Sequence, residues 1–356
     1  FLLINFMTND NIEVAITPIK VNIKELAGSE NTLILRNPNV IFGRYPKDPV
    51  SVKSLVKDIN YPKERNRIII GEHAENQYKP GRIANSVNLL HFNDIYFLSD
   101  DVYVYNGSYV LFTRSCHPKY WEQFYQKKDI VEYKNIREFE SVICLGHQHT
   151  SDFGHWFLEA LPAYSAIPKD ILLKSYVVVP EEKEYIYQGF EAIGVKRDHV
   201  IAGGDNLFFA KNFYTVEFTF CGDLVPFLVN NLRNHFVNLY NLDKVEPDLF
   251  LVYNRKGKSR AIGNFDELMK MLNTKFPKIK WQEAVLPNTL EEQAKYFNRV
   301  KLIFSIHGSI FANGLFMQND TAIVDLQMEQ WLLSFLYLTS YTGKYMVAGR
   351  DPAISW

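Results

Sequence analysis

The feature that most constrains the fold is a regular alternation of strand-like and helix-like segments after Pro247. Short apolar runs typical of strands are separated by stretches in which apolar side chains recur with helical spacing. The expected strands are 249–253, 279–283, 302–306 and 322–326, and the expected helices are 264–273, 289–298, 308–317 and 331–341. Because strands alternating with helices are typical of βαβ units, the sequence predicts a parallel, Rossmann-like sheet.

The first part of the chain, up to about residue 114, has short expected strands without helices between them. The segments 32–36, 40–43, 67–71, 94–99, 102–105 and 109–114 are expected strands joined by polar loops. Asn106-Gly107 between two of them predicts a tight hairpin. From residue 141 on, strands are expected at 141–146, 175–180 and 213–220, and helices at 152–166, 181–193 and 225–242.

A boundary is expected where both patterns are interrupted, close to Asp243 and Pro247. A length of 356 residues favours about two domains. We therefore predict an N-terminal lobe over 1–243, with a β-rich first part, and a C-terminal Rossmann-like lobe over 244–356, whose last helix is a candidate to cross back. In such α/β folds, ligands bind beyond the carboxyl ends of the strands, here in a cleft between the lobes.

Composition excludes several classes of function. The chain has 39 Lys and Arg against 40 Asp and Glu, so it lacks the global positive charge of a nucleic-acid binder. Its 3 widely spaced cysteines cannot build a disulfide framework or a cysteine-based zinc site. No apolar run approaches the roughly 20 residues that span a bilayer. The opening Phe-Leu-Leu-Ile is interpreted as the end of a membrane anchor, and Asn-x-Ser/Thr acceptors at Asn106 and Asn319 favour a secretory location.

The first candidate site is a basic loop directly after the expected strand 249–253. Its sequence is Asn254-Arg255-Lys256-Gly257-Lys258-Ser259-Arg260. Guanidinium groups match phosphate oxygens, and Gly257 allows the backbone to approach a ligand closely, so the loop predicts a phosphate site. The alternative is a solvated basic turn. The Walker pattern Gly-x-x-x-x-Gly-Lys-Ser/Thr is absent, which disfavours a nucleotide hydrolase.

The second candidate site is the turn His307-Gly308-Ser309, where an expected strand runs into an expected helix that contains Asn313. Such a turn offers backbone N–H groups and the positive end of a helix to an anion, and His307 can add a hydrogen bond. Asp325 ends the next expected strand, where acidic residues accept hydrogen bonds from ribose hydroxyls. The alternatives are a helix cap with a partly exposed histidine and an ordinary loop carboxylate. No Gly-x-Gly-x-x-Gly pattern occurs, which disfavours a standard dinucleotide site.

The third candidate site is a histidine-rich segment that runs into an expected helix. Asp152, His155 and Glu159 share one face of that helix, and a carboxylate beside an imidazole can act as a general base near neutral pH. The alternatives are a helix cap at Asp152 and a core histidine paired with Glu159. His147 and His149 resemble a pair of metal ligands, although no matching later set of ligands is evident in the sequence.

Taken together and in this order, the three segments resemble glycosyltransferase family 61. This family includes plant xylosyl- and arabinosyltransferases and animal protein O-GlcNAc transferases of the secretory pathway. The resemblance covers roughly residues 140–330 and is carried by Gly154–Pro162, Asn254–Arg260 with Asn264, His307–Ser309, Asn313–Met317 and Val324–Leu326.

The resemblance implies a GT-B architecture of two Rossmann-like lobes, an acceptor-side N-terminal lobe and a C-terminal lobe that binds the nucleotide sugar. It implies an inverting, metal-independent hexosyl- or pentosyltransferase of class EC 2.4, with a UDP-sugar donor, a glycan or glycoprotein acceptor and no cofactor. It also implies the Golgi or endoplasmic reticulum lumen and a type II membrane anchor.

The resemblance also assigns roles to the candidate residues. The donor would be held by Arg255, Arg260, Asn264, His307, Gly308, Ser309 and Asn313, with Asp325 at the ribose. The face formed by Asp152, His155 and Glu159 is the candidate for the catalytic base.

The sequence departs from the family pattern at several positions. Family members commonly carry Asn at Asp152, Arg at Ala163, Ala at Ser309 and Glu at Asp325. These departures leave open a catalytically inactive, lectin-like protein that binds sugar or nucleotide on the same fold. A metal-dependent hydrolase built on His147 and His149 is the third hypothesis.

Overall fold

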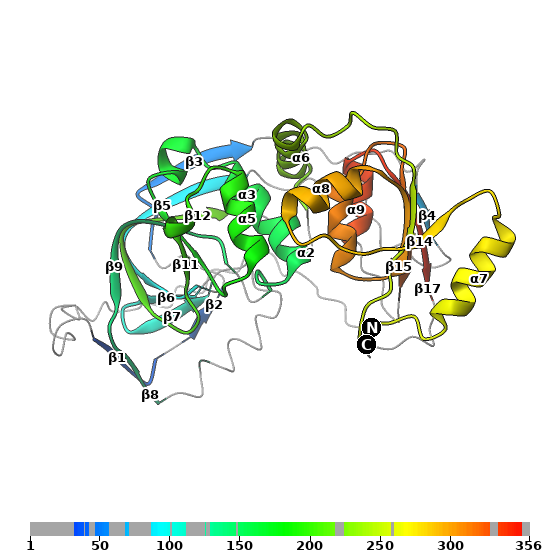
Figure 1. Ribbon diagram of the computed structural model, residues 1–356. Helices are drawn as coiled ribbons and strands as arrows, with labels where there is room; N and C mark the ends of the chain where they lie inside the picture. The colour runs from blue at the N-terminus through cyan, green and yellow to red at the C-terminus, as the bar shows by residue number, and fades with distance from the viewer. Residues whose placement is uncertain are drawn as a thin grey trace, which may run out of the picture.

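The computed structural model describes residues 32–38, 40–42, 47–56, 68–70, 87–99, 102–111, 125, 129–146, 149–217, 224–257, 260–327 and 334–350. They form two large sheets with helices between them (Figure 1). A small antiparallel sheet joins β1 (Leu33–Arg36) to β8 (Ile130–Tyr133). The prediction of a mixed α/β fold with parallel sheets is confirmed.

The first sheet has nine strands within the described residues, in the order β11-β10-β9-β12-β5-β6-β7-β2, with β3 paired to β5. The strands are β2 (Val40–Phe42), β3 (Ser51–Val56), β5 (Val87–Phe97), β6 (Val102–Tyr105), β7 (Ser108–Leu111), β9 (Arg137–Cys144), β10 (Tyr176–Val179), β11 (Val200–Ala202) and β12 (Phe208–Glu217). The four strands from β11 to β12 are parallel. Their order along the sheet is that of one Rossmann half. The direction of the chain across the sheet reverses between β9 and β12, and such a place is called a switch point. A ligand crevice is expected beyond the carboxyl ends of these two strands.

The hairpin predicted at Asn106-Gly107 is confirmed. Strands β6 and β7 pair antiparallel, with Tyr105 opposite Ser108. The backbone φ angles of Asn106 and Gly107 are 49° and 73°, and two positive φ angles are what a type I′ turn requires.

The second sheet is parallel throughout and has the order β14-β13-β15-β16-β17-β4. Its strands are β13 (Leu249–Val252), β14 (Trp281–Glu283), β15 (Val300–Ile306), β16 (Ala322–Gln327), β17 (Tyr345–Arg350) and β4 (Ile68–Ile70). From β13 to β17 this is the flavodoxin-like order, in which the ligand site lies where the chain reverses direction, between β13 and β15. The edge strand β4 comes from the part of the chain before residue 243, a pairing that the sequence did not predict.

Helices pack against both sheets (Figure 1). They are α2 (Phe153–His155), α3 (Leu161–Ser165), α4 (Lys169–Leu172), α5 (Glu184–Ala192), α6 (Pro226–Tyr240), α7 (Phe265–Lys275), α8 (Leu290–Asn298) and α9 (Ser334–Tyr341). In Figure 1, α2, α3 and α5 lie on the side of the first sheet that faces α8 and α9, and α7 lies on the outer side of the second sheet. No helix among the described residues has both the length and the apolar character needed to cross a bilayer.

A single hydrophobic core connects the two sheets through these helices. At its centre the rings of Phe157, Phe236 and Phe316 lie 5.2 to 5.6 Å apart. The backbone N–H of Leu290 at the start of α8 donates to Gln188 Oε1 of α5 at 2.6 Å. The helices of the two sheets therefore pack directly on each other, which fixes the relative position of the loops at the two switch points.

Two predicted α-helices have a different local form. The segment 152–166 contains the π-helical turn η2 (Trp156–Ala160) between α2 and α3, and 308–317 is the 3₁₀ segment η4 (Ser309–Leu315) instead of an α-helix. Asn313-Gly314 within η4 has low helix propensity, which is consistent with the shorter form. Because a short 3₁₀ segment has no large macrodipole, positive charge near this turn has to come mainly from side chains.

Gly146 is a position where the fold tolerates no side chain. It follows β9 at the switch point of the first sheet, and a Cβ there would lie 1.9 Å from the backbone oxygen of Ser99. Gly146→Ala should therefore lower the free energy of unfolding by about 2–3 kcal/mol, as overpacked sites do. Gly263→Ala is the matched control, because nothing lies within 4 Å of its Cβ. Equal urea midpoints for the two variants would contradict this packing.

Candidate active site

The basic loop begins where β13 ends, at the switch point of the second sheet. The side-chain amide of Asn254 closes it, because Oδ1 accepts from the Ile262 N–H at 2.8 Å and Nδ2 donates to the Ile262 oxygen at 3.2 Å. Arg260 has a left-handed backbone with φ of 54°, which helps the loop turn back. Lys258 and Ser259 lie outside the described residues. The loop is thus a closed turn with Arg255 and Arg260 at its two ends.

Arg255 lies close to the turn that follows β15, and Arg260 is near enough to Arg255 for their charges to interact. A Cβ on Gly308 would lie 3.2 Å from Nη2 of Arg255, so this guanidinium group rests against the turn backbone. Burial lowers the pKa of Arg260, the positive charge of Arg255 lowers it further, and the negative charge of Asp152 opposes both. Since two guanidinium groups repel each other here, a bound anion would be stabilised by both.

His307 is held by Asp325 of β16, and Asp325 is in turn held by Gln327 of the same strand. Its Nδ1 lies 2.9 Å from Asp325 Oδ2, and the same oxygen accepts from Gln327 Nε2 at 2.7 Å. The side chains of His307 and Asp325 are 7% and 0% exposed. Asp325 was expected at a strand end facing a ribose, but it lies inside β16 and contacts His307 instead.

The two asparagines predicted at the donor site have different surroundings. Asn313 is buried in η4, where its Nδ2 donates to the Ile310 oxygen at 3.1 Å. Asn264 is exposed at the start of α7, and its Nδ2 lies 3.4 Å from Glu267 Oε2. Neither amide contacts the arginines or His307 through a hydrogen bond that the structure shows.

The third candidate segment forms a compact histidine–carboxylate cluster at α2. His155 Nδ1 lies 2.8 Å from Glu159 Oε1, across the start of the π-helical turn, and the Glu159 side chain is 5% exposed. Asp152 pairs with His149 instead, at 3.4 Å between Oδ2 and Nδ1, and its side chain is 68% exposed. The rings of His149 and His155 are stacked at 5.3 Å. The predicted contact between His155 and Glu159 is present, and His149 is a neighbour that the helical spacing did not reveal.

The charges around His155 favour its protonated form. Burial lowers the pKa of His155, but the hydrogen bond to Glu159 and the negative charges of Glu159 and Asp152 outweigh that effect, and the pKa lies above the usual 6.5. Because Nδ1 faces Glu159, Nε2 is the ring nitrogen that can take a proton from a substrate. The cluster has the chemistry of a general base.

The three sequence segments meet in one place. A Cβ on Gly154 would lie 3.3 Å from Cβ of Ser309, so the first turn of α2 packs against the turn that carries His307. On the other side, the Tyr185 hydroxyl of α5 donates to the Ser151 oxygen and fixes the loop before α2. Burial and the charges of Asp152 and Glu181 raise the pKa of Tyr185 to about 12. Nothing in the sequence pattern marked Tyr185 as a neighbour of this site.

Of the two histidines that resemble metal ligands, only His149 lies within the described residues. His147 lies outside the described residues, and His149 pairs with Asp152. Within the ranges that the structure describes, no group of three or more His, Cys, Asp or Glu side chains is arranged to hold a metal ion.

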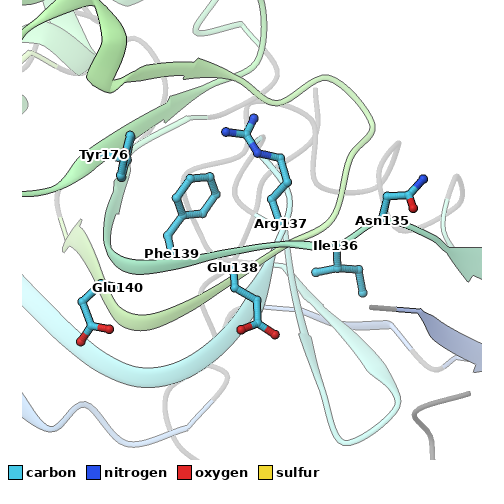
Figure 2. A pocket seen from close by; sticks show the side chains of 7 residues that line it. All are labelled: Asn135, Ile136, Arg137, Glu138, Phe139, Glu140 and Tyr176. Atoms are coloured by element: carbon cyan, nitrogen blue, oxygen red, sulfur yellow. The ribbon is translucent and has the colours of Figure 1, made fainter. Parts of the chain in front are cut away.

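A separate cavity of about 610 Å³ lies at the amino-terminal ends of β9 and β10 in the first sheet. It is lined by Asn135, Ile136, Arg137, Glu138, Phe139, Glu140 and Tyr176 (Figure 2). Arg137 and Phe139 leave the strand on one side, and Glu138 and Glu140 leave it on the other. Because its polar groups do not converge, this cavity is not the candidate site.

A comparison with known families decides what this arrangement belongs to. Residues 153–324 match the family Glycosyltransferase 61. These residues form a glycosyltransferase family 61 domain. No curated protein matches the chain. The resemblance inferred from the sequence is thus confirmed, and the chain is a glycosyltransferase of class EC 2.4, which acts on a sugar donor and an acceptor.

The family 61 domain contains most of the candidate residues. It begins with α2, which carries His155, and η2, which carries Glu159, and it continues through Arg255, Arg260 and His307 into β16. Asp152 and Asp325 lie one residue outside its two ends. The domain therefore draws on both sheets.

Proposed function

We propose that this enzyme is an inverting, metal-independent transferase that moves a sugar from a nucleotide sugar, a UDP-sugar, to a glycan or glycoprotein acceptor. One observation carries the proposal: Arg255 and the His307 turn meet at the switch point of the second sheet, directly beside α2. The guanidinium group of Arg255 and the turn that carries His307 thus lie together beyond the carboxyl ends of the strands of the second sheet. The pair formed by His155 and Glu159 belongs to the segment that packs against this turn.

The chemistry follows from the charges of these groups. Departure of a nucleoside diphosphate builds negative charge on its oxygens, and fixed guanidinium groups in a partly buried loop stabilise that charge without reorganising. Arg255 and Arg260 take this role, and His307 adds one hydrogen bond. His155 Nε2 takes the proton of the acceptor hydroxyl, whose oxygen attacks the sugar carbon on the face opposite the leaving group. The anomeric configuration is therefore inverted.

The wider setting is part of the same proposal. Two Rossmann-like units that each present a switch point to the other support a GT-B arrangement, with the donor on residues 244–356 and the acceptor on residues 1–243. The family 61 domain supports a location in the Golgi or endoplasmic reticulum lumen, with a type II membrane anchor.

A thermal-shift panel tests this proposal. A ligand that binds only the folded state raises the melting temperature in proportion to its free concentration relative to Kd. We expect UDP to stabilise the enzyme equally with EDTA and with manganese, and GDP and CMP to have smaller effects. Stabilisation that appears only with manganese, or by no nucleotide, would contradict the proposal.

The pH dependence of kcat/KM tests the role of His155. A base must be unprotonated to act, so activity should fall as the pH drops through the pKa of His155, which lies above 6.5. Glu159→Gln removes a negative charge that raises this pKa, so the acidic limb of the profile should move to lower pH. Glu184→Gln on the exposed side of α5 is the control. An unmoved limb in Glu159→Gln would exclude His155 as the titrating base.

A further inference from the structure

Asp325 is the most deeply buried carboxylate near the candidate site, and its contacts differ from those the sequence suggested. Its side chain is 0% exposed, whereas a residue that binds a ribose needs an exposed oxygen. Oδ2 contacts His307 Nδ1 at 2.9 Å and Gln327 Nε2 at 2.7 Å. Oδ1 is buried and has no hydrogen-bond partner among the described residues.

The contact has a defined direction. The amide nitrogen of Gln327 can only donate, so Oδ2 of Asp325 is an acceptor, and His307 donates to the same oxygen through Nδ1–H. The other side of the ring is limited by Phe335, whose centroid lies 5.1 Å from that of His307. Together these neighbours leave Nε2 as the ring nitrogen for a ligand.

We propose that Asp325 is a positioning residue that fixes the tautomer and orientation of His307, so that Nε2 meets the diphosphate of the donor. This inference rests on the proposed function. A carboxylate behind a histidine commonly sets which nitrogen carries the proton and where the other nitrogen points. Asp325 therefore contributes to donor binding through His307 and does not contact the ribose.

A double-mutant cycle with UDP as the probe tests this role. Asp325→Ala and His307→Ala should each weaken UDP binding about tenfold or more, and Asp325→Ala should cost little in the His307→Ala background. Asp325→Asn keeps an oxygen that can accept from Nδ1–H, so it should bind UDP more tightly than Asp325→Ala. Losses that multiply in the double variant would overturn the proposal.

Deoxynucleotides separate this role from a ribose contact. If Asp325 does not touch the ribose, 2′-deoxy-UDP and 3′-deoxy-UDP should lose the same affinity relative to UDP in the wild type and in Asp325→Ala. A penalty that disappears in Asp325→Ala would assign the carboxylate to the ribose. Thr339→Val, which removes another buried polar group in α9, controls for a general loss of packing.

The tautomer itself can be observed without a ligand. In ¹⁵N-histidine-labelled enzyme, the His307 ring, assigned by its loss in His307→Gln, should carry a proton on Nδ1, and this signature should be lost in Asp325→Ala. An unchanged signature would overturn the proposal. If UDP does not bind the wild type, the proposed function fails, and this spectrum still tests the pairing.

Discussion

Replacing His155 by alanine should lower kcat by about 10²- to 10⁴-fold and leave the Kd for UDP nearly unchanged. The imidazole is anchored by Glu159 at 2.8 Å and lies in the first turn of α2, which packs against the turn that carries His307. In the proposed mechanism, removing it deletes the group that accepts the proton of the acceptor hydroxyl but no group that touches the diphosphate. Steady-state kinetics with saturating donor, combined with calorimetry of UDP binding, separates the two effects.

A second histidine variant controls for the loss of an imidazole in general. His235 lies on α6, where its Nε2 contacts the Ala192 oxygen at 2.7 Å, and no hydrogen bond or ion pair among the described residues joins it to the candidate site. His235→Ala should leave kcat within about twofold, as expected for a substitution away from the reacting groups. If His155→Ala lowered donor affinity as much as kcat, the residue would be structural.

Removing either donor arginine should weaken UDP binding by about 1.5–3 kcal/mol, the range for hydrogen bonds to charged groups, or about 10- to 150-fold. Arg255 rests against Gly308, and Arg260 is half-buried and close enough for the charge of Arg255 to lower its pKa, so an anion bound beside them interacts with both. Calorimetric titration of Arg255→Ala and Arg260→Ala with UDP measures these losses.

The same loop supplies a matched control. Lys256 is exposed between the two arginines, and Lys256→Ala removes a charge of the same sign. Its effect on Kd should be small and should vanish at high salt, because exposed charges are screened. Equal effects of all three substitutions on the Kd for UDP would show that the loop attracts UDP through its general positive charge and not through specific contacts with the two arginines.

Local periodicity predicted the strands β13 to β16 and the helices α7 to α9, but it did not predict the strand β17 (Tyr345–Arg350). The strand β4 was expected at 67–71, but its place in this sheet was not, since pairing with the distant strand β17 leaves no local pattern. The hairpin at Asn106-Gly107 was predictable for the opposite reason, because the two-residue turn alone determines its pairing.

The candidate site shows the same division. The residues that carry charge, such as Arg255 and His155, were recognisable from type and spacing. The partnership of His307 with Asp325 was not, because it depends on the register of β15 against β16, which sets Ser305 opposite Asp325. The sequence also did not reveal that η4 is a 3₁₀ segment. Because so short a segment has no large macrodipole, we expect an anion near this turn to be bound mainly by the arginine side chains.

A transfer assay in EDTA tests directly whether the enzyme is an inverting, metal-independent transferase. The UDP-sugar that stabilises the enzyme best would be incubated with an array of glycan and glycoprotein acceptors, and the new anomeric linkage would be assigned by proton NMR. We expect transfer without added metal and a linkage of opposite configuration to that of the donor. Retained configuration, transfer that needs manganese, or nucleotide binding without any transfer would contradict this expectation.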